Sequence, residues 1–436
     1  MELKSACQEY GSFKDCARAP IHGWFQYPAG YSYRLIESKA KEYSLNEHSW
    51  VLDPFVGCGT TLIVLKETGI NSIGIEAHPF IYWVAKTKLY WEYDMTAFEQ
   101  AIKAFGTELS AHLASNCPEE VDTLQLPALL RKCYSSQNLK ALVRIRRIIE
   151  NSVTDVHIRD FLRLCLTATL RLSSKAGTGW PYIAPTKYHE KTRERDAAEA
   201  FATQLWRMCS DLRLVSARAK KNGATCKIMH GDAREQHPEI PPESFDLAIT
   251  SPPYLNNYDY ADRTRLEMYF WEQAKSWRDI TTQVRDKLIM CATTQTKRSS
   301  LNSGSYLSYD IREASRLVYE KLSDSLLQLA AIRLKKGGKK NYDVMVAGYF
   351  TDMLKVLKQV CRLLKPGCDF VLVLGDSAPY GVYIPTEYYL GELALGVGYS
   401  RYRITELRQR GGKWPGNPQR HKVALKESIL TITKGE

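Results

Sequence analysis

The feature that most constrains the fold is a regular alternation of short apolar runs with stretches of helical periodicity. Between Trp50 and Trp91 the chain reads as strand, glycine turn, helix, strand and helix, and strand-like runs return at 226–232, 245–254 and 370–377. The last run, FVLVLGDS, is continuously apolar, as expected for the middle of a parallel sheet. Strands that alternate with helices predict a doubly wound α/β sheet, closed by two final strands near 402–408 and 427–433.

Residues 95–225 interrupt this alternation. Their apolar periodicity is helical and strand signals are few, so the sequence predicts a large helical insertion between residues 1–94 and 226–436. Within it, Lys140, Arg144 and Arg147 share one helix face. A solvated face explains these residues as well as a phosphate-binding stripe does. A second polar section, residues 275–342, ends in the run KKGGKK.

The charge balance indicates the kind of partner. The 436 residues carry a net charge of +12, which favours an anionic partner, either nucleic acid or a membrane surface. No apolar run approaches the roughly 18 residues that a membrane span needs, and the N-terminus lacks the apolar core of a signal peptide. The expected location is therefore cytoplasmic. The 11 cysteines form no CxxC pair, so we expect reduced thiols and no metal site.

A glycine turn, VLDPFVGCGTT, suggests a ligand site. Its strand ends at Asp53, and Gly57 and Gly59 allow the backbone to turn tightly and approach a ligand. Thr60 and Thr61 then open a helix whose free N–H groups face the same point. The turn has neither GxxxxGK[ST] nor GxGxxG, which disfavours a nucleotide phosphate loop and a dinucleotide site.

Two further features mark strand ends. Glu76 closes the next strand, 17 positions after Gly59, where a carboxylate can accept hydrogen bonds from ribose hydroxyls. SPPY (Ser251–Tyr254) follows the strand FDLAIT. Its two prolines fix φ and exclude helix, so the chain leaves the sheet in a stiff extended turn. Since ligands bind at the carboxyl ends of parallel strands, we expect the glycine turn and the SPPY turn to meet at one rim.

Together, DPFVGCGTT and SPPY resemble the DNA amino-methyltransferases, which form N4-methylcytosine or N6-methyladenine. FQYPAGYSYRLI (25–36), HGD at Asp232 and the segment 372–399 are also similar to segments of this family, and about half of the chain is covered. The resemblance implies a Rossmann-like methyltransferase sheet, S-adenosylmethionine as cofactor and DNA as substrate. It also implies a cofactor site formed by Tyr27, Asp53, Pro54, Phe55, Gly57, Gly59, Thr60, Thr61, Glu76 and Asp232.

The resemblance further implies that Ser251, Pro252, Pro253 and Tyr254 form the catalytic turn. An exocyclic amine is a poor nucleophile because its lone pair is delocalised into the ring. The Ser251 hydroxyl and the Pro252 carbonyl are placed to accept the amine hydrogens, which frees the lone pair. Tyr254 would stack on a base flipped out of the duplex. The chain has no Pro-Cys pair, which argues against methylation of cytosine carbon 5.

Several alternatives remain open. Serine at the first position of the catalytic turn favours cytosine N4, whereas aspartate there is commoner for adenine N6. An RNA enzyme such as a tRNA guanine-N2 methyltransferase would usually show DPPYG, which is missing. A DNA-binding protein that has lost catalysis would not be expected to keep Ser251, Gly57, Gly59 and Glu76. A cognate restriction endonuclease is an expected partner.

The region that reads the DNA sequence departs from the family pattern, because the chain ends soon after its last predicted strand. We expect recognition to lie in 95–225, helped by 275–342. The Arg-, Gly- and Pro-rich loop 408–422 suits phosphate contact. After the SPPY turn, Arg263 and Arg265 are expected to line the DNA channel, while Leu266, Tyr269 and Phe270 pack on the core.

Overall fold

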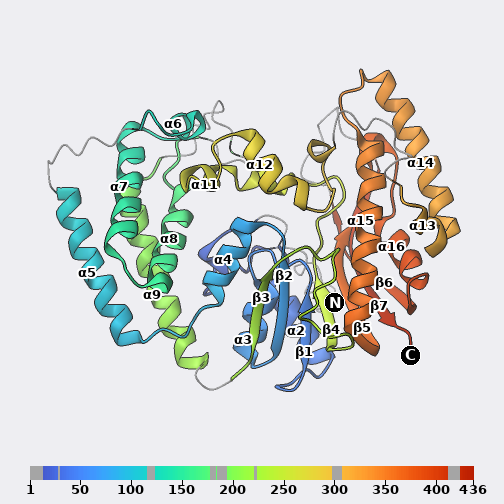
Figure 1. The fold of residues 1–436 in the computed structure, drawn as a ribbon, viewed down its shortest axis with the longest axis horizontal. Coiled ribbons are helices and arrows are strands. Elements are labelled where there is room, and N and C mark those ends of the chain that lie inside the picture. Colours follow the sequence, from blue (N-terminus) through green and yellow to red (C-terminus); the bar gives the residue numbers. More distant parts are fainter. Residues whose placement is uncertain are drawn as a thin grey trace.

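The computed structural model describes residues 13–27, 30–114, 123–176, 183, 194–219, 223–296, 307–410 and 423–436. Its centre is a seven-stranded sheet with the order β3-β2-β1-β4-β5-β7-β6 (Figure 1). The strands are β1 (Trp50–Asp53), β2 (Asn71–Glu76), β3 (Cys226–His230), β4 (Phe245–Thr250), β5 (Leu364–Gly375), β6 (Tyr399–Arg410) and β7 (Leu425–Lys434).

The direction of the strands confirms the predicted doubly wound architecture. β1 to β5 pair in parallel, whereas β7 is antiparallel to both β5 and β6. The strand order reverses between β1 and β4, so the topological switch point lies there. In open α/β sheets this is where ligands bind, outside the carboxyl ends of the strands.

Both faces of the sheet are covered, and β5 shows how its sequence permits this. Because side chains alternate across a strand, Phe370, Leu372 and Leu374 belong to the core cluster on one face, and Val371 and Val373 to the cluster on the other. The first face carries α14 (Arg316–Lys335), α15 (Tyr342–Leu363) and α16 (Thr386–Leu395), preceded by α13 (Tyr309–Ala314). The second carries α2 (Tyr33–Glu42) and α3 (Thr60–Thr68).

In the described ranges, the regular elements between β2 and β3 are all helices. After α4 (Pro79–Leu89) come α5 (Met95–Ala114), α6 (Ala128–Cys133), α7 (Ser136–Ser152), α8 (Val156–Leu170) and α9 (Ala197–Ala219). Figure 1 shows these helices gathered beside the sheet. They share one core cluster with α4 and Trp24, which stands in the short 3₁₀ turn η1 (His22–Trp24). On α7, Lys140 and Arg147 are exposed and Arg144 is half-buried.

The chain between β4 and α13 connects this helical insertion to the sheet. It forms α10 (Tyr260–Arg263), α11 (Arg265–Phe270), α12 (Trp277–Gln283) and the 3₁₀ turns η2 (Arg285–Lys287) and η3 (Thr293–Gln295). Arg171, at the end of α8, donates to Glu267 of α11 at 2.7 Å. The Trp271 indole donates to the Thr167 hydroxyl of α8 at 2.8 Å. None of the helices in the described ranges is both long and apolar enough to cross a bilayer.

The structure corrects one expectation for this segment. Arg263 does not line a DNA channel: it is 5% exposed, pairs with Glu267 at 3.3 Å and donates to the Gln26 carbonyl at 2.8 Å. Arg265 pairs with Asp262 and lies over the Trp277 ring. Arg263 therefore serves the folded structure, because a buried charge must be paired, whereas Arg265 is half-buried. The predicted packing of Leu266, Tyr269 and Phe270 on the core is confirmed.

Candidate active site

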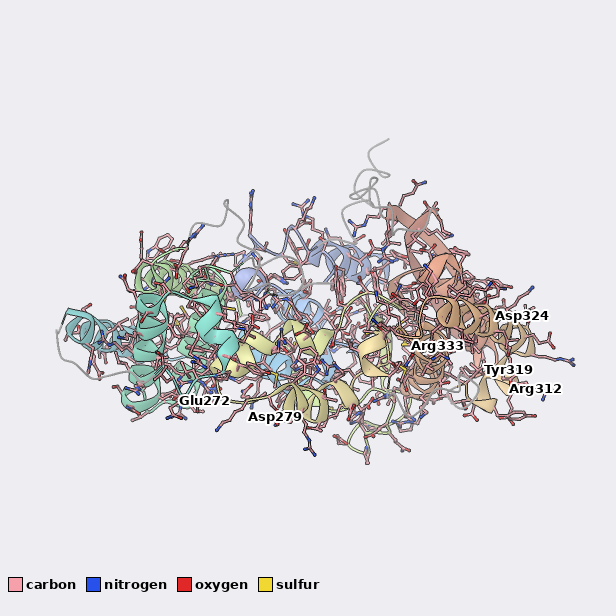
Figure 2. All side chains as sticks on the ribbon, turned by 90° about the horizontal axis from the view of Figure 1, so that it is seen from above. Glu272, Asp279, Arg312, Tyr319, Asp324 and Arg333 are labelled. Carbon is pink, nitrogen blue, oxygen red and sulfur yellow. The ribbon has the colours of Figure 1, made fainter. Side chains whose placement is uncertain are left out.

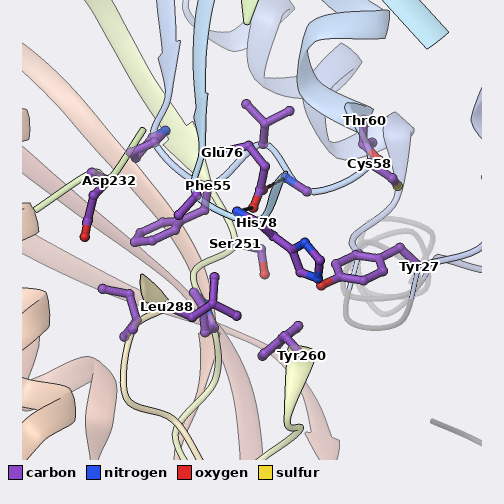
Figure 3. A pocket seen from close by; sticks show the side chains of 18 of the residues that line it. Tyr27, Phe55, Cys58, Thr60, Glu76, His78, Asp232, Ser251, Tyr260 and Leu288 are labelled. Carbon is purple, nitrogen blue, oxygen red and sulfur yellow. Dashed lines mark hydrogen bonds between the residues drawn. The ribbon is translucent and has the colours of Figure 1, made fainter. Parts of the chain in front are cut away.

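A pocket opens at the carboxyl ends of β1, β2, β3 and β4, next to the switch point. Its volume is about 830 Å³ when the solvent-filled space at its mouth is included. Figure 3 shows that side chains from distant parts of the sequence converge on it. The predicted site residues among its lining are Tyr27, Pro54, Phe55, Gly57, Thr60, Glu76, Asp232, Ser251 and Pro253.

The glycine turn has the backbone conformation that its sequence predicted. Gly57 and Gly59 have φ values of 55° and 92°, in the left-handed region that residues with a side chain rarely adopt. Gly59 is the N-cap residue of α3, and the Gly59 N–H donates to the Val56 carbonyl at 3.0 Å. The turn thereby brings the start of α3 to the wall of the pocket.

Asp53 and Thr61 lie behind the pocket rather than in it. Asp53 is 1% exposed and accepts hydrogen bonds from the Thr250 hydroxyl at 2.6 Å, from the Phe55 N–H at 3.0 Å and from the Thr61 hydroxyl. Burial raises the pKa of Asp53, while these hydrogen bonds lower it. The carboxylate therefore ties β1 to β4 and α3, and holds the glycine turn against the strand that carries SPPY.

Glu76 ends β2 with its carboxylate in the pocket. Its two oxygens accept the Gly57 N–H and the His78 N–H, both at 2.8 Å (Figure 3). Burial raises the pKa of Glu76 to about 7, and the backbone hydrogen bonds partly oppose this shift. The carboxylate is thus fixed in position, and its charge depends on pH near neutrality.

The segment before β1 forms one side of the pocket. Tyr27 lines it, and its ring lies 6.1 Å from the ring of Tyr260, which follows the SPPY turn. Tyr31 also lines the pocket, and its hydroxyl bonds to the Thr61 hydroxyl. Neither Tyr31 nor Tyr260 was singled out from the sequence. Both stand in aromatic-rich stretches, which was the available signal.

The acid after β3 reaches the pocket but is engaged by a neighbour. Arg234 donates to both carboxylate oxygens of Asp232, at 2.6 to 3.0 Å, and also pairs with Asp352 at 2.9 Å. Arg234 further donates to the Lys287 carbonyl at 2.9 Å, so it holds residues 287–289 against the pocket. No motif in the sequence indicates that 287–289 form this wall.

The SPPY turn divides between the pocket and the interior. Ser251 and Pro253 line the pocket, whereas Pro252 and Tyr254 do not. The Ser251 hydroxyl oxygen is buried and forms no hydrogen bond of normal geometry with the described residues, although burial raises the pKa of the Tyr254 hydroxyl and Ser251 lies close enough to lower it in part. Buried hydroxyl groups are nearly always paired, so an unpaired one beside a cavity indicates a group that a ligand completes.

Tyr254 is held in place by residues of β6 and β7. Its hydroxyl donates to Glu427 of β7 at 2.8 Å, and Glu427 also accepts from Arg408 at 2.6 Å. The guanidinium of Arg410 lies over the tyrosine ring, 5.2 Å from its centroid. Arg410 fits there because Gly375 has no side chain: a Cβ at position 375 would lie 2.1 Å from the Arg410 Nη1 atom. The remainder of the predicted phosphate-contacting loop, residues 411–422, lies outside the described residues.

The residues that line the pocket are chemically suited to bind S-adenosylmethionine. It has a fixed carboxylate for ribose hydroxyls at Glu76, a glycine turn that permits close approach, and aromatic or apolar walls at Phe55, Tyr27 and Leu288. The Ser251 hydroxyl faces the same cavity. Cofactor and acceptor base could therefore meet between the two turns, because Gly57 and Ser251 belong to one pocket.

Comparison with known proteins is consistent with this geometry. Residues 12–87 match a family model described as "DNA methylase", a segment that contains β1, the glycine turn, β2 and Glu76. The chain is 24% identical to type II methyltransferase M.BsoBI of Geobacillus stearothermophilus, over 95% of this chain and 86% of that protein. It is also 24% identical to type II methyltransferase M.AvaI of a Nostoc species, over 93% of this chain and 84% of that protein.

A third relative aligns with a shorter segment of the chain, at a higher sequence identity. Type II methyltransferase M.MjaII of Methanocaldococcus jannaschii is 37% identical over 82 residues, which is 19% of this chain and 15% of that protein. The match to the family model, the similarity along nearly the whole chain, and the sheet with its pocket agree with one another. By these similarities the chain resembles the DNA amino-methyltransferases, whose methyl donor is S-adenosylmethionine.

Proposed function

We propose that this protein methylates the exocyclic N4 of cytosine in DNA. The observation that carries the proposal is the buried, unpaired Ser251 hydroxyl beside the cofactor pocket. Serine at this position of the turn favours cytosine over adenine. The relatives M.BsoBI and M.AvaI are named type II methyltransferases, so we further propose that the protein acts at a specific sequence alongside a cognate restriction endonuclease.

The catalytic turn supplies hydrogen-bond acceptors to the target amine. The Ser251 hydroxyl and the Pro252 carbonyl accept the amine hydrogens, so the nitrogen lone pair becomes available. The bound cofactor supplies an activated methyl group. As the nitrogen becomes positively charged, acceptors that are already oriented stabilise it, which lowers the barrier. The prolines hold these acceptors in place, so little reorganisation is needed during the reaction.

The cofactor is held by the other face of the pocket. When the cofactor is bound, Glu76 would accept hydrogen bonds from its ribose hydroxyls and Asp232 would contact its adenine, while Phe55 and residues 287–289 would line the pocket around it. Tyr27 would line the same pocket beside Tyr260. Asp53 and Thr61 act indirectly, by fixing the glycine turn to β1 and β4.

The target base must leave the duplex to reach Ser251, and we propose that Tyr254 stacks on it. Base–aromatic stacking contributes about 1–3 kcal/mol per base. Arg410 lies over one face of the ring in the structure, so stacking on that face requires its guanidinium to move aside. The helical insertion 95–225, joined to the catalytic segment through Arg171, is proposed to read the sequence, and 275–342 is proposed as an additional DNA-contacting segment.

The experiment is methylation of duplex DNA that contains many sequences, followed by mass spectrometry of the released nucleosides. N4-methylcytosine is the expected product. Formation of N6-methyladenine alone would overturn the choice of base, and methylation of RNA but not DNA would overturn the substrate. Ser251→Ala should abolish most product, whereas the control Ser323→Ala should not, because Ser323 only caps a carbonyl within α14.

A further inference from the structure

Four lysines cluster on the turn between α14 and α15, at residues 335–340, called here the lysine turn. Lys335, Lys336, Lys339 and Lys340 are all exposed. The nearest acid in sequence, Asp343, is already paired with Arg333 at 3.0 Å. In the described part of the chain, no carboxylate forms a salt bridge with any of the four. The turn is therefore a concentrated, unneutralised positive charge.

The base of this turn is rigid, although its tip projects freely. The Gly338 N–H donates to the Arg333 carbonyl at 3.0 Å, and the Arg333 guanidinium donates to Asn341 at 3.0 Å. Asn341 in turn donates to Thr296 at 3.3 Å. At the tip, Gly337 and Gly338 have φ values of 78° and 73°, and a Cβ on either would meet nothing within 4 Å. The lysines thus extend into solvent from a fixed platform.

Aromatic rings orient two of the amines. Tyr342 and Tyr380 pack edge to face with their centroids 4.7 Å apart. The Lys336 amine lies 4.9 Å from the Tyr380 centroid, and the Lys340 amine 5.9 Å from that of Tyr342. Tyr380 has a φ of 51°, a strained conformation for a residue with a side chain. The rings direct the amines without cancelling their charge, as an acid would.

The lysine turn stands on the same rim of the sheet as the pocket. Tyr380 lies in η5 (Pro379–Gly381), just beyond the carboxyl end of β5, and β5 pairs in parallel with β4 up to Thr250, which precedes Ser251. Figure 1 shows α14 and α15 meeting at the edge that also carries α11 and α12. Seen from above in Figure 2, Arg333 lies nearer the middle of the molecule than Arg312 and Asp324.

We propose that the lysine turn binds the phosphate backbone of duplex DNA beside the target base. The proposal rests on the proposed function, since it takes DNA as the substrate. Lysine amines act as compact charges toward phosphates, and their contacts fix the position of the duplex without reading its sequence. Each such contact releases a condensed counterion, so binding through the turn must weaken as salt rises.

The test measures duplex binding by fluorescence anisotropy at several salt concentrations, with a variant of the full chain in which Lys335, Lys336, Lys339 and Lys340 are each replaced by Gln. A plot of the logarithm of the association constant against the logarithm of the salt concentration has a negative slope. Each lost phosphate contact should make this slope less steep by about 0.9, so the loss of all four should make it less steep by up to about 3.6. A matched control replaces four exposed lysines elsewhere, Lys41, Lys227, Lys321 and Lys355, and should keep the wild-type slope.

Two further readouts separate this proposal from the function on which it rests. Preference between the recognised sequence and an unrelated duplex should stay unchanged in the variant, as should methylation at saturating DNA and low salt. A slope equal to that of the wild type, or an equal loss in the control, would overturn the role of the lysine turn. Failure of the wild-type protein to methylate DNA would instead overturn the proposed function, whatever the slopes.

Discussion

Replacing Glu76 by glutamine tests the cofactor site most directly. Its two carboxylate oxygens accept the Gly57 and His78 N–H groups at 2.8 Å, which leaves further lone pairs directed into the pocket for ribose hydroxyls. Glutamine offers one oxygen, and its NH₂ group must then face one of these two backbone donors. Glu76→Gln therefore weakens the ribose contacts and disturbs the glycine turn at the same time.

The size of the effect follows from the number of hydrogen bonds lost. A hydrogen bond to a charged group contributes about 1.5–3 kcal/mol, and the variant keeps at most one neutral acceptor for two hydroxyls. A total loss of about 2–4 kcal/mol corresponds to an increase of about 30- to 700-fold in the Kd for S-adenosylmethionine. Glu235→Gln is the matched control, because Glu235 is an exposed acid near the same rim that does not line the pocket.

The pH dependence gives an independent check on the same residue. Burial raises the pKa of Glu76 to about 7, so the binding-competent carboxylate is depleted as the pH falls through neutrality. Since apparent affinity scales with the competent fraction, the wild-type Kd should rise about tenfold from pH 8 to pH 6. Isothermal titration calorimetry of the full chain measures both effects. Binding by Glu76→Gln within threefold of wild type, or a wild-type Kd that is flat across this range, would refute the reasoning.

Three further predictions follow from the catalytic turn and the buried arginine. Ser251→Ala should lower kcat by about 10²–10³-fold with little change in cofactor affinity, as expected for one oriented group at the developing charge; an unchanged single-turnover rate would contradict this role. Tyr254→Phe and Glu427→Gln should each lower kcat/KM for DNA by about tenfold, and the double variant should be no worse than either single one; additive losses would mean that their hydrogen bond is irrelevant. Arg263→Met should destabilise the protein by about 3–5 kcal/mol in denaturant unfolding, because it removes a partner of the buried Glu267 carboxylate; a loss below about 1 kcal/mol would be inconsistent with that burial.

The parts of the site that could be predicted are those encoded by local patterns. A strand followed by Gly57 and Gly59 needs positive φ at those positions, and a strand followed by two prolines needs an extended exit, so both turns were evident. That they share a pocket follows from the parallel pairing of β1 with β4. Glu76 was recognised for the same reason, since it ends the strand that follows the glycine turn.

The parts that escaped prediction depend on which distant segments pack together. The burial of Asp53 is set by Thr250, a residue 197 positions away, so its structural role could not be seen in its own motif. Arg234 positions residues 287–289 by donating to the backbone carbonyl of Lys287. Every residue has such a carbonyl, so the side chains at 287–289 do not reveal this contact. Arg263 looked like a DNA contact, because an exposed and a buried arginine are indistinguishable until the partner Glu267 is placed beside it.

The ion pair between Arg171 and Glu267 bears on how this protein can be re-engineered. The helical insertion and the segment after the catalytic turn are joined by this pair and by the bond from Trp271 to Thr167. If the insertion came from a relative without an arginine in the place of Arg171, the buried Glu267 carboxylate would lose this ion-pair partner. Chimaeras built to change the target sequence should therefore exchange 95–225 and 260–272 as one unit.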